Sequence, residues 1–530
     1  MLFILVTFIV LAKAFDKCDD DFEPDYVIVG GGAGGSVAVN KCITAGHKCL
    51  LLERGTDYVD PFAQIPGQNV VSYFTGSTRY TASAPLQNVY NKTIIFMEPN
   101  ILGGSTTINA MVSLFTDINN FYREINVTGW SYAEMLPHYL SVTKSLNRPS
   151  STGPVEVTNT LLTDPAYLAF KAAVTSVFPN IPERVPDMNT VSLTANFSGY
   201  GPPESTVKTF STPVGNVATR SSGYVAFVQA LRNHPNLRII TSATVERITF
   251  NSGGSKTKDV IVSRVGSDGV ARTCEVSAVK GVILSAGALR TPQILLRSGV
   301  GPSADLQALG IPVIRNNADV GRNLDDHPSI ANQHIGFTST SLYSANIEGH
   351  AYWNHQDDPA LINDWSVQIV GFLPTTAIPP GFKSSLTQLM NQKSRGSVKI
   401  QANGEPIIDL GYFNAVEDYL PAGLGYEKSI AVTNALGYYP ITPVVCPSFL
   451  SHCLTNSTAF YTAAFLQYGT VGYHFTGTCA LGKVVNPASG KVYGFDDLYV
   501  VDASVLPKAP RGNTQLSVYA LALKLSAAIF

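Results

Sequence analysis

Six residues near the N-terminus, Gly30 to Gly35, read GGGAGG and fit the pattern G-x-G-x-x-G through Gly30, Gly32 and Gly35. Each glycine has its own task in a dinucleotide site. The first allows a tight turn, the second lets the backbone approach a pyrophosphate, and the third lets a helix pack closely on a strand. A helix that begins here would direct free N–H groups and a partial positive charge at the phosphates. The spacing therefore predicts a dinucleotide site.

The segments around these glycines support the same interpretation. Residues 26–29 and 49–52 are apolar and read as two buried strands, and residues 36–45 between them have helical character and end at Gly46. Glu53 follows the second strand, where its carboxylate could accept hydrogen bonds from a ribose diol. The alternative is a glycine-rich turn in some other α/β protein.

A second glycine-rich segment indicates which dinucleotide is bound. Residues 102–111 read LGGSTTINAM and form a loop of small residues, with Gly103, Gly104 and Ser105 at the start of an expected helix. The first fingerprint alone does not distinguish FAD from NAD. Because a long dinucleotide could be clasped between two such loops, the second loop favours FAD.

Length and composition limit the remaining classes. The chain has 530 residues, of which 45% are hydrophobic, so two domains with sizeable cores are expected. Charged residues make up 14% and the formal net charge is −2, which gives no indication of a nucleic-acid partner or an acidic membrane surface.

The first residues indicate export. An apolar run over residues 2–11 precedes Ala12-Lys13-Ala14, which predicts a signal peptide over residues 1–14 that is too short to span a bilayer. The alternative is an apolar first strand. Together with this leader, four N-x-S/T sequons predict a secreted glycoprotein, and they lie at Asn91, Asn126, Asn196 and Asn456.

The cysteines do not form a disulfide scaffold, since there are seven in a chain of this length. Cys446 and Cys453 could close a small ring, and the odd total leaves at least one free thiol or an intermolecular bond. Cys479 is expected to be buried packing rather than a nucleophile. The sequence has no C-x-x-C pair and no H-E-x-x-H motif, so a metal site has no support.

The rest of the chain is less regular. An acidic stretch from Asp16 to Asp25 is expected to be a solvated arm, and the final helix, apolar nearly all round, is expected to be buried. The expected elements after the second glycine loop are loops over 199–214, strands within 238–250, 259–265 and 275–285, a helix from Thr291, a mixed region over about 320–465, and the final helix over about 515–529.

Several motifs, in order along the chain, resemble those of the glucose–methanol–choline (GMC) oxidoreductases over nearly the whole mature sequence. The matching segments are residues 100–111, GALRTPQILL at 287–296 with SGVGP at 298–302, VGRNL at 320–324 with Asp326 and His327, SRG at 394–396, YH at 473–474 with GTC at 477–479, and VDASVLP at 501–507.

The resemblance implies an α/β fold with a Rossmann-like FAD-binding domain made of separated segments, here 22–140, 205–316 and 470–530. It also implies a mixed α+β substrate domain, over 141–204 and 317–469, with an antiparallel sheet over the flavin. The residues expected to hold FAD are Gly30, Gly32, Gly35, Glu53, Arg54, Gly103, Gly104, Ser105, Asn109, Val245, Asp502 and Asn513.

The cofactor is expected to be noncovalent. Some relatives attach the flavin to a histidine upstream of the LGGS loop, and this chain has no histidine between His47 and His138.

The resemblance further implies a catalytic histidine in the YHxxGTC element and a second polar residue before the last helix, positions that His474 and Asn513 fill. An imidazole is suited to accept the hydroxyl proton near neutral pH. The amide of Asn513 cannot act as a base, but it can hydrogen-bond the substrate oxygen. The alternatives are a structural histidine at 474 and a helix N-cap at 513.

Other polar and aromatic residues are assigned less specific roles. His327 is expected to be structural, supporting the connection between the domains, and Tyr473 and Phe475 could shape an apolar pocket. A further group, in the least family-like region, either lines the substrate entrance or belongs to a solvated loop: His350, Trp353 and His355.

The function expected from the sequence is a secreted FAD-dependent oxidase of a small alcohol, with oxygen as the second substrate. The best specific hypothesis is an aromatic or cyanohydrin-like alcohol such as mandelonitrile. A hydroxynitrile lyase is the alternative, against which Asn513 counts because the almond-type lyases carry histidine there. A non-catalytic secreted binding protein is the third hypothesis. The sequence gives no basis for an oligomeric state.

Overall fold

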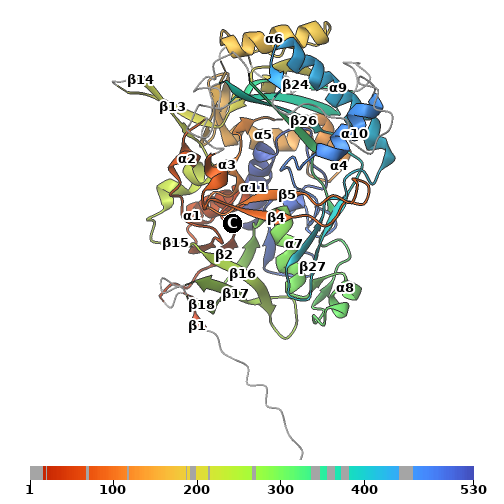
Figure 1. Cartoon of the computed structure of the whole chain (residues 1–530). Coiled ribbons are helices and arrows are strands. Elements are labelled where there is room, and N and C mark those ends of the chain that lie inside the picture. Colours follow the sequence, from red (N-terminus) through yellow and green to blue (C-terminus); the bar gives the residue numbers. More distant parts are fainter. Residues whose placement is uncertain are drawn as a thin grey trace, which may run out of the picture.

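A computed structural model gives the fold of the chain (Figure 1). It describes residues 16–18, 21–66, 71–115, 118–160, 162–186, 188–190, 198–212, 215–265, 270–335, 347–354, 364–371, 381–440 and 458–530. The predicted signal peptide lies outside these ranges, and so does His355. The same holds for two of the sequons, Asn196 and Asn456, and for both cysteines of the predicted ring, Cys446 and Cys453. Within the described ranges, no helix is both long and apolar enough to cross a membrane.

A parallel sheet of five strands forms the centre of the first domain. Every strand is parallel to its neighbour, and the order is β15 (Leu237–Ile240), β3 (Cys49–Leu52), β2 (Tyr26–Val29), β19 (Gly281–Leu284) and β30 (Leu498–Val500). β2, β3 and β19 are buried along their whole length, as expected for a parallel sheet covered on both faces. Three distant parts of the chain therefore build this one sheet.

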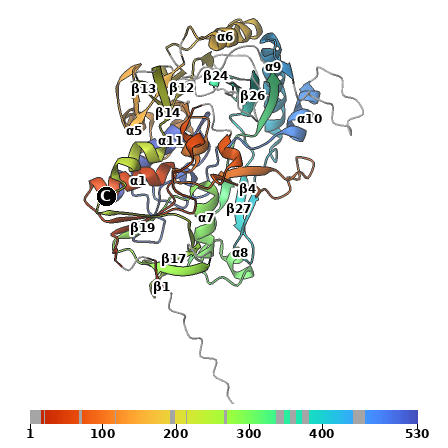
Figure 2. The same cartoon turned by 60° about the vertical axis from the view of Figure 1, so that its left-hand side comes forward.

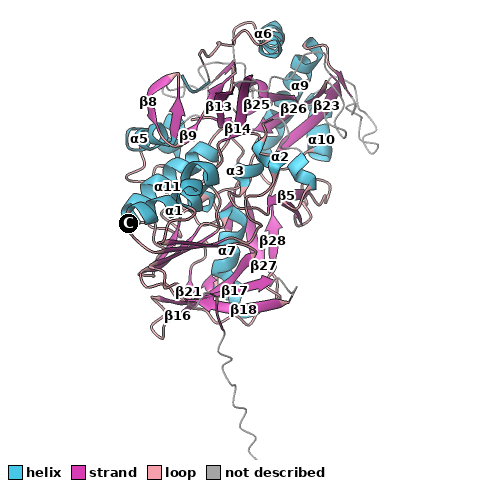
Figure 3. Ribbon diagram, turned by 90° about the vertical axis from the view of Figure 1, so that its left-hand side faces the viewer, coloured by secondary structure: helices cyan, strands magenta, loops and turns pink. Residues whose placement is uncertain are grey.

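Helices and a second sheet cover these strands. α1 (Ala33–Thr44) packs against α11 (Gln515–Ile529), and the two helices lie side by side in Figures 1 and 3. The second sheet contains β16 (Ala243–Phe250), β17 (Thr257–Val265) and β18 (Ala271–Val276). Buried side chains of all these elements form one continuous hydrophobic core.

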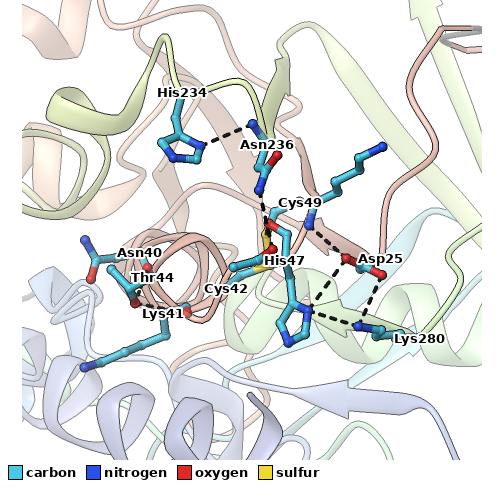
Figure 4. The surroundings of a disulfide bond; sticks show 12 residues. Asp25, Asn40, Lys41, Cys42, Thr44, His47, Cys49, His234, Asn236 and Lys280 are labelled. Carbon is cyan, nitrogen blue, oxygen red and sulfur yellow. Dashed lines mark hydrogen bonds and ion pairs between the residues drawn. A yellow bond between two sulfur atoms is a disulfide. The ribbon is translucent and has the colours of Figure 1, made fainter.

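Two disulfides lie within this domain, Cys42–Cys49 and Cys18–Cys274. Cys42 near the end of α1 pairs with Cys49 at the start of β3, with Cα atoms 6.4 Å apart. Figure 4 shows this bond beside Asp25, whose carboxylate accepts a hydrogen bond from the Lys48 N–H (2.9 Å) and lies 3.3 Å from the Lys280 ammonium. Cys479, the one free cysteine among the described residues, is fully buried, as expected.

The acidic stretch is not a free arm, so that expectation is wrong for its described part. Residues 16–17 (β1, Asp16–Lys17) pair in parallel with β18, and Cys18 forms a disulfide with Cys274, with Cα atoms 5.0 Å apart. Charge alone suggested solvation, whereas a covalent bond and sheet pairing hold this segment.

The second domain is built on an antiparallel sheet of six strands. Their order is β11 (Gly199–Gly201), β24 (Ile347–Trp353), β25 (Trp365–Gly371), β26 (Phe382–Leu389), β23 (Ser329–Ile335) and β29 (Tyr439–Pro440). Its outer face packs on α6 (Pro165–Val177) and α9 (Tyr419–Ala435), with α10 (Thr458–Tyr468) beside α9. Figure 2 shows α6, α9 and this sheet at the opposite end of the molecule from β17.

The remaining helices and strands lie outside these three sheets. α7 (Gly287–Arg297) begins four residues before the expected Thr291, and the helix expected after Gly104 is a single turn, α3 (Ser105–Ile108). The others are α2 (Pro61–Gln64), α4 (Ile118–Ile125), α5 (Tyr132–Val142), α8 (Ser303–Ala308), β4 (Thr78–Ala82), β5 (Ile95–Pro99), β6 (Val112–Ser113), β7 (Thr143–Ser145), β8 (Arg148–Thr152), β9 (Val155–Glu156), β10 (Thr158–Asn159), β12 (Glu204–Ser205), β13 (Val207–Thr212), β14 (Gly215–Arg220), β20 (Val300–Gly301), β21 (Arg315–Asn316), β22 (Arg322–Leu324), β27 (Gly396–Ile400) and β28 (Pro406–Asp409).

The loops expected over 199–214 are another error. This segment contains β11, β12 and β13, and β13 pairs with β14 in an antiparallel hairpin of six residue pairs. Glycine and proline in the segment suggested loops, but pairing with partners elsewhere in the chain overrides that local preference.

The expected fold class is confirmed: an α/β domain on a parallel sheet, joined to a mixed domain with an antiparallel sheet. The residue boundaries proposed for the two domains stay a prediction.

Candidate active site

Tight backbone packing explains three glycines at the carboxyl end of β2. Gly30 has a φ of +95°, and a Cβ there would lie 2.6 Å from the Ser285 carbonyl oxygen. A Cβ at Gly35 would lie 1.9 Å from the Gly30 carbonyl oxygen, and one at Gly34 would lie 1.9 Å from that of Val501. Side chains at these positions would push α1 off the sheet. Gly34 is a packing glycine that the fingerprint did not single out.

Gly32 faces open space instead. A Cβ at this position would meet no protein atom within 4 Å, and Gly32 is the N-cap of α1. The backbone of Gly32, Ala33 and Gly34 forms part of the wall of a cavity. This is the arrangement in which helix N–H groups can bind a pyrophosphate.

Glu53 closes the adjacent turn. Its carboxylate accepts hydrogen bonds from the backbone N–H groups of Gly31 and Gly55, each at 2.7 Å. Burial raises the pKa of Glu53, and these two hydrogen bonds act in the opposite direction. The side chain also lines the cavity, where it could accept hydrogen bonds from a ribose.

The second glycine loop lies against the first. A Cβ at Gly104 would lie 2.8 Å from the Cα of Gly32, and the Gly103 N–H donates to the Gly31 carbonyl at 3.0 Å. Gly104, Ser105 and Asn109 line the same cavity. The two loops therefore face one channel, as expected for a long dinucleotide.

Asn109 is held by its surroundings. Its Oδ1 accepts from Arg220 Nη1 (2.8 Å) and from the Met111 N–H (3.0 Å), and its Nδ2 donates to Gln515 Oε1 (2.5 Å). Because both ends of the amide have partners, its orientation is fixed.

Asp502 anchors another part of the wall. It accepts hydrogen bonds from the Gly287 N–H (2.9 Å), the Thr291 hydroxyl (2.6 Å) and the Ser504 N–H (2.8 Å). Burial raises its pKa, while the hydrogen bonds lower it. Asp502 thus joins the start of α7 to the C-terminal segment.

Arg54 belongs to a cluster of charges at the channel. Its Nη2 donates to the Pro99 carbonyl (3.1 Å) and lies 3.9 Å from Glu98, which also pairs with Arg79 and Arg290. Burial lowers the pKa of Arg54 to about 10. With three arginines around one carboxylate, the cluster is net positive, as suits a channel for a dinucleotide.

The cavity has a volume of about 580 Å³ and extends from these loops to the antiparallel sheet. Among the expected site residues it is lined by Gly30, Gly32, Glu53, Arg54, Gly104, Ser105, Asn109, Val245, His474, Asp502 and Asn513. Gly35 and Gly103 are not in its wall. A Cβ at Gly35 would meet the Gly30 carbonyl, and one at Gly103 would lie 2.2 Å from the Thr107 hydroxyl. The individual roles of these residues stay predictions.

His474 and Asn513 lie together where the channel meets the sheet. Asn513 Nδ2 is 3.3 Å from His474 Nε2, and both side chains line the cavity. Asn513 is not the N-cap of α11, since that position belongs to Thr514 and has no side-chain capping bond. Its amide is therefore not engaged in capping and faces the His474 imidazole.

His327 makes a contact that the sequence did not indicate. It was expected only to support the domain connection, but its Nδ1 lies 2.8 Å from His474 Nδ1. Both imidazoles are buried. Burial lowers the pKa of His474 to about 4 and lowers that of His327 well below its usual range. Both rings are accordingly neutral at pH 7.

Asp326 holds the loop that carries His474. Its carboxylate accepts from the backbone N–H groups of His474 (2.6 Å) and Gly472 (3.0 Å) and from the Tyr412 hydroxyl (2.5 Å). Burial raises the pKa of Asp326 to about 7, although these hydrogen bonds lower it. A motif of the form NLxDH gave no sign of this contact.

The sheet supplies the wall opposite the glycine loops. Gln368, Val370, Ser384, Leu386 and Gln388 project from β25 and β26 into the cavity. Sequence reasoning found none of them, since isolated glutamines on a strand form no motif. His350 and Trp353 lie in β24, where they are buried, so the solvated-loop interpretation is wrong for both.

The residues present fit an FAD. Backbone N–H groups at the start of α1, a carboxylate at the end of β3 and the His474 imidazole at the far end of the same cavity suit a pyrophosphate, a ribose and a flavin in turn. Among the described residues, no group of three His, Cys, Asp or Glu side chains could hold a metal ion.

Comparisons with known proteins agree with this geometry. The two GMC oxidoreductase family models match residues 24–329 and 392–522. The chain is 52% identical over 529 residues to a protein of Acanthamoeba polyphaga mimivirus named as a GMC-type oxidoreductase, covering 97% of this chain and 93% of that one. It is 28% identical over 556 residues to the oxygen-dependent choline dehydrogenase of Cronobacter sakazakii, covering 95% of this chain and 94% of that one.

The fold is similar to that of a solved structure as well. Pyridoxine 4-oxidase from Mesorbium loti superimposes with a TM-score of 0.80 at 24% identity, covering 95% of this chain and 99% of the other. The chain therefore belongs to the GMC oxidoreductase family, whose members are FAD-dependent oxidoreductases that act on alcohols.

Proposed function

We propose that this protein oxidises a small, uncharged alcohol to a carbonyl compound, with oxygen as electron acceptor. The observation that carries the proposal is the pairing of His474 Nε2 with the Asn513 amide in the wall of the FAD channel. FAD, when bound, supplies the hydride acceptor and returns two electrons to oxygen, giving hydrogen peroxide.

The residues of the chain handle the proton and the orientation of the alcohol. His474 Nε2 accepts the hydroxyl proton as the C–H bond gives up its hydride, so the alcohol loses one proton and one hydride in total. The Asn513 amide donates to the substrate oxygen and holds it near the base. Protonated His474 then favours negative charge on oxygen during reoxidation.

An uncharged substrate is supported by the state of the carboxylates. Those that line the described cavity wall are all held by N–H groups, hydroxyls or arginines: Glu53, Glu98, Glu246, Glu405 and Asp502. A cationic alcohol would therefore find no free counter-charge among them. Choline, the substrate named for one relative, is for this reason disfavoured.

The narrower proposal is an aromatic or cyanohydrin-type alcohol such as mandelonitrile. Tyr73, Tyr473 and Phe475 line the cavity and provide aromatic surface for such a substrate. Anaerobic flavin reduction over a panel of neutral aryl, aliphatic and cyanohydrin alcohols tests it. Cyanide release without flavin reduction would favour the lyase alternative.

The first prediction concerns the base. His474→Ala should lower the rate of flavin reduction at least about 100-fold, within the range of a lost general base. FAD should stay bound, because the glycine loops and Glu53 are untouched. Asn513→Ala should be milder, since it loses an orienting hydrogen bond. Stopped-flow reduction measures both, and a parent-like rate in His474→Ala would show that another residue is the base.

The second prediction is a pH dependence. Protonated His474 has no lone pair at Nε2, and its pKa lies near 4, so flavin reduction should be lost only as the pH falls through about 4. A midpoint near the ordinary value of about 6.5 would contradict this.

The third prediction is noncovalent FAD. The sequence upstream of the LGGS loop has no histidine between His47 and His138, so no side chain of that type is available there for attachment. Acid precipitation should release all flavin absorbance into the supernatant. Absorbance that stays with the denatured chain would overturn the prediction.

The fourth prediction is export through an oxidising compartment. The disulfides Cys18–Cys274 and Cys42–Cys49 support it, because such bonds persist mainly outside the cytosol. Exposed Asn91 and Asn126 suit glycosylation. N-terminal sequencing should start near Phe15, with a mass loss on deglycosylation. A chain that begins at Met1 without glycans would remove the proposal.

A further inference from the structure

A chain of hydrogen bonds with a fixed direction ends on the catalytic base. It begins at the backbone carbonyl of His327, which can only accept, and which accepts from the Ser329 hydroxyl at 2.9 Å. The Ser329 oxygen must then act as acceptor for its next neighbour, Gln388 Nε2, at 3.1 Å. This fixes which end of the Gln388 amide faces Ser329.

The direction passes on through two further amides. Gln388 Oε1 faces Gln368 Nε2 at 3.1 Å, so Gln368 presents its NH₂ group. The same NH₂ group lies 3.5 Å from Asn513 Oδ1. A reversed Asn513 amide would set two NH₂ groups against each other. Asn513 therefore turns its own NH₂ group toward His474 Nε2, 3.3 Å away.

At the base this direction selects one tautomer. An NH₂ group facing Nε2 requires a lone pair there, so the proton of neutral His474 resides on Nδ1. That N–H donates to His327 Nδ1 at 2.8 Å. On the other side, His327 Nε2 has no hydrogen-bond partner among the described residues, so no further contact fixes which nitrogen of His327 carries the proton. The bias therefore comes from the Asn513 side.

The geometry points to Ser329, Gln388 and Gln368 as positioning residues that set the tautomer of His474, leaving Nε2 unprotonated and directed at the alcohol. His327 completes the arrangement by accepting a hydrogen bond from the Nδ1–H of His474. All four side chains are buried. The catalytic meaning of the inference rests on the proposed function.

Nitrogen NMR reads the tautomer directly and needs no substrate. Holoenzyme labelled with ¹⁵N in its histidine rings is measured at pH 7, and His474 is assigned by its loss in His474→Gln. We expect Nδ1 to be protonated and Nε2 to be bare. A proton on Nε2 in the parent protein overturns the inference.

The variant Gln368→Glu should reverse the direction of the hydrogen bond to Asn513 while the side chain keeps nearly the same shape. A carboxylate only accepts, so Asn513 should turn its NH₂ group toward Glu and its oxygen toward His474, moving the proton to Nε2. Flavin reduction should then fall at least about ten-fold, since a positioned general base contributes on the order of 10²–10⁴-fold. The matched control is Gln333→Glu, which places the same group on an exposed position of the same sheet and should leave the tautomer unchanged.

A second pair of variants covers the case in which a buried carboxylate prevents folding. Ser329→Ala removes the hydroxyl that starts the chain and should let a second His474 tautomer appear, whereas Ser329→Thr keeps the hydroxyl and should restore the parent spectrum. An unchanged tautomer in both Gln368→Glu and Ser329→Ala overturns the inference. A parent spectrum as expected, with no alcohol able to reduce the flavin, would instead contradict only the proposed function.

Discussion

The cofactor channel depends on the close approach of backbone to backbone at the carboxyl ends of the central parallel strands. Cβ atoms at Gly34 and Gly35 would lie 1.9 Å from carbonyl oxygens of Val501 and Gly30, so α1 can seat on the sheet only because these positions have none. The approach of Gly104 to Gly32 then brings the second loop to the same point. A side chain at Gly34, Gly35 or Gly104 would separate the two loops that form the channel.

Buried carboxylates connect this arrangement to His474 and Asn513. Asp325 accepts from Gln392 Nε2 (2.5 Å) and from the Ala509 N–H (2.9 Å), and its neighbour Asp326 accepts from the N–H groups of Gly472 and His474. A buried charge is costly unless it is fully hydrogen-bonded. Each carboxylate therefore holds its partner segments firmly, and these segments carry both His474 and Asn513.

The local parts of the fold were predictable from the sequence, and the long-range parts were not. The strand–glycine–helix–strand unit around Gly30 and the final helix over 515–529 each have a pattern within a short window. The pairing of β11 with β24 joins residues about 150 positions apart, so no window contains it. The same limit explains why the segment after Gly199 was expected to be loops.

The residues of the candidate site likewise fall into those that a local motif predicts and those that only long-range strand pairing brings to the site. Gly32, Glu53 and His474 sit in motifs whose chemistry can be read from residue type and spacing. Gln368 and Gln388 acquire a role only through strand register, since β25 and β26 pair Ser366 with Gln388 and Gln368 with Leu386, which sets both glutamines on the cavity face. A slip of one residue would turn them toward the helices behind the sheet. The orientation of the Asn513 amide thus depends on sheet register, and motif reading cannot supply that information.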